Sequence, residues 1–158
     1  MTYNVFFSYS TANLATAQNI RNYFIQIPNT DVFLCEDTVT VGQLTQDITT
    51  KINSCDMFIV LYDRHSHTSQ YVQNEIGVAT GARKPIIPLV LESQYLPTAM
   101  LTGTRYYPIW DEKNWRTKLP ELYSYLKQKA EERSNVEIAL VIGAILALGF
   151  LLFGGRGK

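Results

Sequence analysis

The chain lacks an excess of charge of either sign. Its 158 residues include fourteen Lys and Arg residues and fourteen Asp and Glu residues, so the formal net charge is zero. Nucleic-acid-binding domains usually carry a basic patch, and acidic tails carry a run of like charges. The balance gives no reason to expect a nucleic-acid partner, and the length allows one domain of ordinary size.

Cysteine is scarce as well. Cys35 and Cys55 are the two cysteines, and both lie at the edges of apolar stretches without metal-ligand spacing. We expect both to be small buried hydrophobes in a reducing compartment, not members of a disulfide framework. His65 and His67 have no third ligand at a suitable spacing, so no metal site is expected.

A secretory leader is missing too. The first ten residues, MTYNVFFSYS, have neither the basic segment nor the long apolar stretch of a signal peptide. The N-terminal domain is therefore expected to stay in the cytoplasm.

Glycine is absent from the loop after the first expected strand, where the sequence reads Ser8-Tyr9-Ser10-Thr11. A Rossmann dinucleotide site needs glycines there so that the backbone approaches a pyrophosphate, and a phosphate-cradling P-loop is excluded for the same reason. A phospho-receiver domain would place its acceptor at Asp63, after the third strand. No acidic pair follows the first strand and no lysine ends the fifth, so this class is excluded as well.

What the sequence does contain is an alternation of strand and helix patterns. Aromatic, β-branched or continuous apolar runs predict strands at 3–8, 31–35, 57–62, 85–91 and 105–110. Helical spacing of apolar residues between these strands predicts connecting helices, the second over Leu44, Ile48 and Ile52. The pattern predicts a doubly wound α/β domain with a flavodoxin-like three-layer fold and a five-stranded, mostly parallel sheet.

Pro88 and Pro120 each interrupt the pattern of a predicted element. Pro88 lies in the fourth strand, where it removes a ladder donor, and a bulge is expected there. Pro120 lies within the helical stretch 111–133, where it predicts a break or a new helix start.

The C-terminal segment differs in kind from the rest of the chain. Residues 138–153 include no charged or strongly polar side chain. At about 1.5 Å per residue this run spans about 24 Å, close to the roughly 30 Å of a hydrocarbon core. It predicts a transmembrane helix at 136–155, after a domain at 1–133 and before a short tail at 156–158, which makes the protein a single-pass membrane protein that contacts lipid. A buried helix packed on the domain is the alternative.

The helix expected after Ser69 carries the leading candidates for a functional site. Tyr71 and Glu75 lie four residues apart in its first two turns. A strand–helix–strand unit places this helix start at the carboxyl ends of the strands, where open α/β sheets bind ligands. We therefore expect both side chains to face a site. A solvated glutamate near a helix start and a packing tyrosine are the ordinary alternatives.

Four segments, in order, resemble the TIR (Toll/interleukin-1 receptor) domain family. They are FFSYS at 6–10, EDTVTVGQ at 36–43, SQYVQNE at 69–75 and KPIIPLVL at 84–91. The third is similar to the family's Ser-x-Trp-x-x-x-Glu signature, with Tyr71 in the tryptophan position. The resemblance covers roughly residues 3–130 and extends to the prokaryotic TIR proteins of Thoeris-type antiphage defence.

The resemblance implies an enzyme that cleaves the nicotinamide–ribose bond of NAD, with hydrolysis, cyclisation or base exchange to follow. Glu75 would be the catalytic residue, and NAD would be the substrate, with no separate cofactor. The substrate-binding residues would be Ser8, Tyr9, Ser10, Asp37, Ser69 and Tyr71. Helix capping by residues 8–10 and a turn at Asp37 are the alternatives for those positions.

A single carboxylate suits this chemistry. Glycosidases usually need two, one of them to protonate the leaving oxygen. Nicotinamide leaves as a neutral base from a nitrogen that is already cationic, so no general acid is required. The resemblance also implies other TIR domains as partners in a homo-oligomer and a downstream effector that senses the product. A non-catalytic scaffold acting by homotypic TIR–TIR assembly is the alternative function.

Overall fold

The computed structural model describes residues 2–35 and 43–153, with side chains described except at 43–45 and 145–153. Within this part, five strands form one sheet in the order β2-β1-β3-β4-β5. Every strand pair is parallel. The strands are β1 (Tyr3–Ser8), β2 (Thr30–Leu34), β3 (Met57–Tyr62), β4 (Ile86–Val90) and β5 (Tyr107–Pro108).

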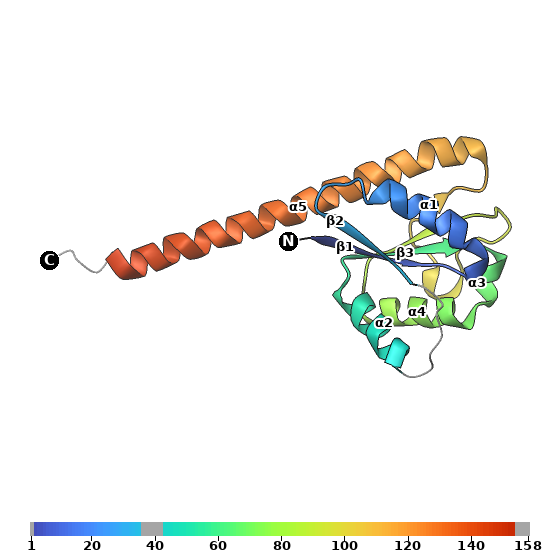
Figure 1. Ribbon diagram of the computed structural model, residues 1–158, viewed down its shortest axis with the longest axis horizontal. Coiled ribbons are helices and arrows are strands. Elements are labelled where there is room, and N and C mark those ends of the chain that lie inside the picture. Colours follow the sequence, from blue (N-terminus) through green and yellow to red (C-terminus); the bar gives the residue numbers. More distant parts are fainter. Residues whose placement is uncertain (1, 36–42, 154–158) are drawn as a thin grey trace.

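Helices cover both faces of this sheet (Figure 1). One face carries α1 (Leu14–Phe24) and the first part of α5 (Glu112–Phe153), and the other carries α2 (Gln43–Ser54) and α4 (Gln70–Gly81). Three shorter elements are the 3-10 turns η1 (Thr11–Asn13) and η2 (Ala99–Leu101) and the helix α3 (Arg64–Thr68). The predicted flavodoxin-like α/β architecture with a five-stranded sheet is confirmed.

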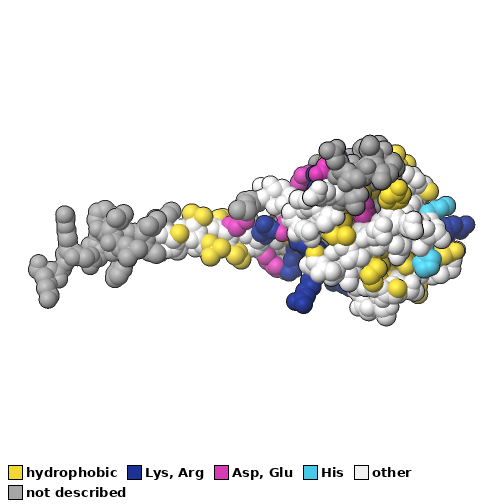
Figure 2. Space-filling view, turned by 90° about the horizontal axis from the view of Figure 1, so that it is seen from below, with side chains coloured by type: hydrophobic (Ala, Val, Ile, Leu, Met, Phe, Trp, Pro, Cys, Tyr) yellow, Lys and Arg dark blue, Asp and Glu magenta, His cyan; other side chains and the backbone are white. Residues whose placement is uncertain are grey.

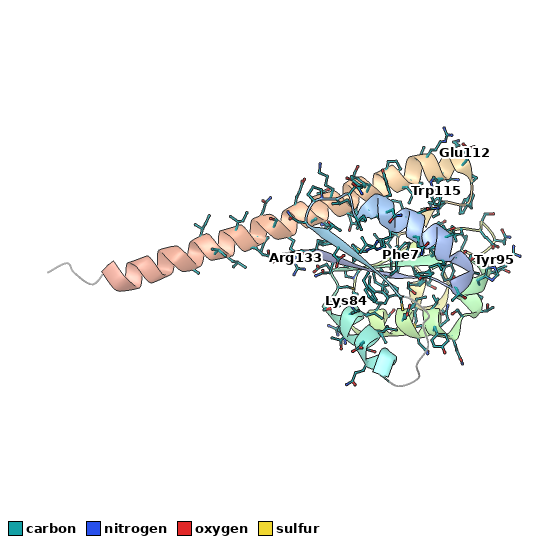
Figure 3. The ribbon with its side chains drawn as sticks, in the orientation of Figure 1. Phe7, Lys84, Tyr95, Glu112, Trp115 and Arg133 are labelled. Carbon is teal, nitrogen blue, oxygen red and sulfur yellow. The ribbon has the colours of Figure 1, made fainter. Side chains whose placement is uncertain are left out.

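Side-chain alternation along β1 divides the core into two layers. Val5 and Phe7 belong to the apolar cluster shared with α1 and α5, whereas Phe6 belongs to the cluster shared with α4. Successive residues of a strand point to opposite faces, so one short strand serves both layers. Figure 3 shows Phe7 between the sheet and α1. All six residues of β3 are buried, as expected for a central parallel strand covered on both faces.

The structure does not show the bulge expected at Pro88. The β3–β4 register runs without a slip from Phe58↔Ile86 to Tyr62↔Val90, with Pro88 opposite Val60. Leu91 N donates to Tyr62 O. Backbone groups of successive strand residues bond to opposite neighbours, so odd-numbered residues here bond to β3 and even-numbered residues face β5. The nitrogen of Pro88 therefore faces the β5 side. Strand β5 pairs only with Leu89 and Val90. The missing donor is therefore directed where no ladder forms, and no bulge is needed.

The break expected at Pro120 is also absent, because α5 runs through it without interruption. Leu119, Leu122 and Leu126 are buried on one side of α5, and Pro120 itself is exposed. The packing of these leucines keeps the helix continuous despite the one hydrogen bond that proline cannot donate.

The second half of α5 projects away from the domain (Figure 1). In the part of the chain that the structure describes, no helix is both long enough and apolar enough to cross a membrane. The membrane span predicted at 136–155 is therefore not found. The structure describes 136–153 as part of α5, with side chains described up to 144, and 154 and 155 lie outside the described residues.

Candidate functional site

The carboxyl ends of β1 and β3 mark the point at which the strand order reverses. From β1 the chain crosses through α1 to β2 at one edge, then returns through α2 to β3 on the other side of β1. Open α/β sheets bind ligands in the crevice at such a switch point. The buried polar residues Ser8, Ser10, Asp63 and Glu75 belong to this end of the sheet or to the helix α4 that follows β3.

Glu75 is buried, with 7% of its surface exposed. It lies on the inward stripe of α4 together with Val72, Ile76 and Ala79. Ser69 is the N-cap of α4, and its Oγ accepts a hydrogen bond from Val72 N at 3.4 Å. This cap sets where α4 begins and thereby which residues face the sheet. Ser69, predicted to contact substrate, therefore also caps α4 through its hydrogen bond with Val72 N.

Two side chains from neighbouring strands contact the Glu75 carboxylate. Ser8 Oγ, at the end of β1, donates to Oε2. Cys35 Sγ, which directly follows β2, donates to Oε1 at 2.7 Å. Both donors are neutral, and each contacts a different carboxylate oxygen. The arrangement brings together the predicted catalytic residue and Ser8, and it adds Cys35, for which the sequence predicts only a small buried hydrophobe.

A sequence signal for Cys35 exists in the strand register. Phe7 pairs with Leu34, so Ser8 and Cys35 are the next residues on adjacent parallel strands. Cys35 N also donates to Phe7 O at 3.2 Å, which continues the ladder by one step. Because parallel strands end at one edge of a sheet, the residue after β2 lies beside the residue at the end of β1. The sequence signal for Cys35 is therefore its position directly after the second predicted strand.

Tyr9 lies on the opposite side of the sheet from Glu75. Its side chain is buried in the cluster shared with α1 and α5, and 3% of its surface is exposed. Ser8, the last residue of β1, contacts Glu75 on the other side. The prediction that Tyr9 contacts substrate stays a prediction.

A second buried carboxylate, Asp63, follows β3 beside Ser10. Asp63 Oδ2 accepts from Asn13 Nδ2 at 2.8 Å, and that amide also donates to Ser10 Oγ at 3.4 Å. Asp63 Oδ1 accepts from Ser66 N at 2.8 Å, and Ser66 Oγ accepts from Asp63 N at 2.8 Å. This capping box begins the short helix α3. The network ties the loop after β1 to the end of β3.

Tyr71 and Glu75 do not share an environment. Tyr71 is 56% exposed on α4, whereas Glu75 belongs to the buried stripe. The ring is therefore not a core residue. The expectation that Tyr71 and Glu75 both face a site stays a prediction. Asp37 lies outside the described residues, so its predicted role is not tested here.

His65 and His67 lie on α3. His67 Nδ1 is 3.2 Å from Tyr62 Oη, and its ring packs near Tyr95. Tyr95 lies at the end of the domain opposite the projecting part of α5 (Figure 3). Within residues 2–35 and 43–153, no group of three or more His, Cys, Asp and Glu side chains is arranged to hold a metal ion.

A groove of about 760 Å³ runs along β2 between α1 and α2. Its lining includes Arg21, Phe33, Cys35 and Lys51. Arg21 Nε donates to Val32 O at 2.9 Å, and Lys51 Nζ lies 3.9 Å from the centre of the Phe33 ring. Both cations are engaged with β2, and the groove reaches the site through Cys35.

Known structures share this architecture. The TIR domain of the Toll-related receptor TRR-2 from Hydra magnipapillata has a TM-score of 0.64 at 16% identity, over 80% of this chain and 99% of that one. The Clostridium botulinum CMP N-glycosidase BcmB has a TM-score of 0.56 at 24% identity, over 75% and 97% of the two chains. A TIR domain chain of the activated Roq1 resistosome, which recognises the pathogen effector XopQ, has a TM-score of 0.50 at 10% identity, over 80% and 84%.

At these identities the structures show a shared fold. Among curated proteins, none matches the chain. The family model described as TIR domain matches residues 5–123, which is most of the domain and includes β1, the loop after β2, α4 and β4. The narrower resemblance to Thoeris-type proteins stays a prediction. The chain belongs to the TIR domain family.

Proposed function

We propose that this TIR domain cleaves the N-glycosidic bond between nicotinamide and ribose in NAD, with Glu75 as the catalytic carboxylate. The observation that carries the proposal is the burial of Glu75 at the switch-point end of the sheet, with Ser8 and Cys35 each contacting one carboxylate oxygen. Ligands of open α/β sheets bind at this position.

Burial of this side chain is costly for the fold. An ionised carboxylate loses several kcal/mol of hydration when it is taken into a protein interior. The neighbouring inward residues of α4 are Val72, Ile76 and Ala79, and an apolar residue at position 75 would continue their stripe. Perturbed, buried ionisable groups are found most often at functional sites. The cost favours a chemical role over a purely structural one.

The reaction needs a negative charge more than a proton donor. As the bond between ribose C1′ and the pyridinium nitrogen breaks, its electron pair moves to that nitrogen, and nicotinamide leaves neutral. The positive charge is left on the ribose as an oxocarbenium-like cation. A fixed carboxylate stabilises this charge strongly in a site from which water is largely excluded.

The Glu75 carboxylate also suits the sugar of the substrate as a hydrogen-bond acceptor. A carboxylate accepts at two oxygens, with about four lone-pair positions in all. In the proposed complex it accepts hydrogen bonds from the two ribose hydroxyls. Water then adds to C1′ and loses a proton in the hydrolytic outcome, or an internal nucleophile of the nucleotide adds in the cyclising outcome.

The likeness to BcmB supports the reaction class. That protein is described as a CMP N-glycosidase, so the same architecture supports cleavage of an N-glycosidic bond in a nucleotide. Cytosine is a poorer leaving group than nicotinamide, because its nitrogen is not already cationic. With one buried carboxylate in hydrogen-bond contact with Ser8 and Cys35, NAD is the better-matched substrate, and CMP serves as the comparison substrate in the test.

A non-catalytic TIR scaffold is the alternative function. A scaffold needs an intact surface but no buried carboxylate with donors on both oxygens. Self-association through TIR–TIR contacts is compatible with either function, and we propose it for this chain on the basis of family membership.

The test compares Glu75→Gln with the parent chain in NAD cleavage, measured as nicotinamide release with product identification by mass spectrometry. Removing one electrostatic stabiliser of a transition state commonly costs about 100-fold or more in turnover, and that loss is expected here. Glu121→Gln is the matched control, because Glu121 is an exposed residue of α5 paired with Arg105. Turnover by Glu75→Gln within threefold of the parent contradicts the assignment, and cleavage of CMP but not NAD contradicts the substrate.

Membrane attachment through the C-terminal segment is a separate proposal. It is supported by the apolar run at 138–153 and by exposed apolar side chains on α5 at Val136, Ile138, Leu140, Val141 and Ile142. Figure 2 shows hydrophobic side chains on the part of α5 that leaves the domain. Lysines at positions 141 and 142 should reduce co-flotation of the full chain with phospholipid vesicles, whereas lysine at the exposed Leu14 of the domain should not.

A role in antiphage defence is supported by the resemblance of the sequence alone. Bacteria that produce the chain should give fewer plaques than bacteria that produce Glu75→Gln at matched protein level. Equal plaque counts across a panel of phages, with NAD cleavage intact, would leave the enzyme without this role.

A further inference from the structure

The thiol of Cys35 has a contact that packing alone does not require. Cys35 is 4% exposed and belongs to the apolar cluster between the sheet, α2 and α4. Its Sγ lies 2.7 Å from Glu75 Oε1, while Ser8 contacts Oε2. Three elements, β1, β2 and α4, therefore meet at one carboxylate, and each supplies one side chain.

We propose that Cys35 is a positioning residue that holds the Glu75 carboxylate in its working orientation by donating its thiol hydrogen to Oε1. The catalytic meaning of this contact rests on the proposed function, but the hydrogen bond itself does not.

Two donors are needed to fix the carboxylate group. The terminal torsion of a glutamate is broad, so one donor leaves the carboxylate free to turn about its last bond. Donors on both oxygens define the plane of the group. The backbone beneath Cys35 is held as well, because Cys35 N donates to Phe7 O and so continues the β1–β2 ladder. The two donors therefore lie side by side, Ser8 at the end of β1 and Cys35 directly after β2. The register of these strands sets the distance between them.

A thiol is a weaker donor than a hydroxyl. It orients the carboxylate while withdrawing less of its charge, which leaves more acceptor strength for the ribose hydroxyls and the developing cation. Loss of a donor to the charged form makes a carboxylate easier to protonate, so Cys35→Ala should move the acidic limb of the pH–rate profile to higher pH. Among the described residues, the titratable side chains that line the groove with Cys35 are Arg21, Asp31, Asp47 and Lys51. Asp63 is linked to Ser10 through Asn13.

A packing role and a positioning role for Cys35 predict opposite orders of tolerance for its replacement by alanine and by serine. A buried cysteine that serves as a small hydrophobe tolerates alanine better than serine, because a buried hydroxyl must find a partner. A cysteine that serves as a donor tolerates serine better than alanine. Cys55 is the matched control, since it is also 4% exposed and belongs to the same cluster.

The kinetic test uses the full chain with NAD. Hydrogen bonds to charged groups contribute enough that Cys35→Ala should lower kcat by about tenfold, with KM changed less than about twofold. Cys35→Ser should recover kcat to within about threefold of the parent. At Cys55 the order should reverse, with alanine at least as active and as stable as serine. Cys35→Ala at full activity with an unmoved pH profile overturns the positioning role.

The spectroscopic test needs no activity. In the Cys55→Ala chain, Cys35 supplies the one thiol S–H stretching band in the infrared. An amide oxygen is a weaker acceptor than a carboxylate, so adding Glu75→Gln should move this band to higher frequency. An unmoved band overturns the hydrogen bond and the proposal with it. If the band moves as expected but the Cys55→Ala chain with Glu75 intact, like the parent, cleaves no NAD, the proposed function is overturned instead and the contact is a structural one.

Discussion

Glu75→Gln is expected to make the protein more stable while it removes activity. Glu75 is 7% exposed and lies in an otherwise apolar stripe of α4. An ion at such a position carries an effective desolvation penalty of several kcal/mol, which the neutral amide avoids. Each of the two hydrogen bonds from Ser8 and Cys35 weakens by about 1 kcal/mol when its acceptor loses the charge. The balance favours glutamine by about 1–2 kcal/mol.

The coupling between Glu75 and Ser8 gives an internal check on this balance. Ser8→Ala should cost about 1.5–3 kcal/mol in the parent chain, where the hydroxyl bonds a charged acceptor, but about 0.5–1.5 kcal/mol beside glutamine. The double-mutant cycle should therefore show an interaction energy of about 1 kcal/mol. Ser8 is buried, so loss of its hydroxyl leaves the carboxylate oxygen short of a donor.

The assay is urea unfolding at neutral pH, followed by tryptophan fluorescence, because Trp115 packs against the core. A gain of 1–2 kcal/mol corresponds to a rise in Tm of about 2–8 °C for a chain of this size. The m-value should stay constant across the four proteins of the cycle. If Glu75→Gln loses more than about 1 kcal/mol at constant m-value, Glu75 stabilises the fold, and its burial is then no sign of a chemical role.

Three further outcomes follow from the contacts described above. Tyr71→Ala should change the unfolding free energy by no more than about 0.5 kcal/mol, because the ring is 56% exposed. The same substitution should raise KM for NAD. A larger loss of stability in urea would show that the ring packs against the domain. Asp63→Ala should lower the unfolding free energy by about 1–3 kcal/mol in urea titrations, because α3 loses its N-cap and the Asn13 amide loses its acceptor. Burial, followed by the neighbouring Tyr125, raises the pKa of Tyr3 from 10.0 to about 12, so the folded state retains a proton that the unfolded chain releases. Stability should therefore fall as pH rises from about 10 towards about 12, and Tyr3→Phe should fall less steeply in the same titration.

The order of elements and the identity of the central residue were accessible from the sequence. Continuous apolar runs at 57–62 and 85–91 require strands covered on both faces, and the helical spacing of Val72, Ile76 and Ala79 places α4 between them. Glu75 was identified by its place near the start of that helix and by the family resemblance. These features depend on local periodicity and on the rule that ligands bind at the carboxyl ends of parallel strands. They can therefore be predicted from the amino-acid sequence alone.

The partners of Glu75 were decided by the tertiary structure. Ser8, Cys35 and Glu75 lie 27 and 40 residues apart along the chain, and only the β1–β2 register and the packing of α4 bring them together. The same register places Tyr9 in the opposite core layer, because one step along a strand reverses the direction of the side chain. Pro88 and Pro120 make the same point for the backbone. Proline forbids a hydrogen bond at its own nitrogen, but whether that bond was needed depends on which strand lies beside it and on how well the surrounding helix is packed.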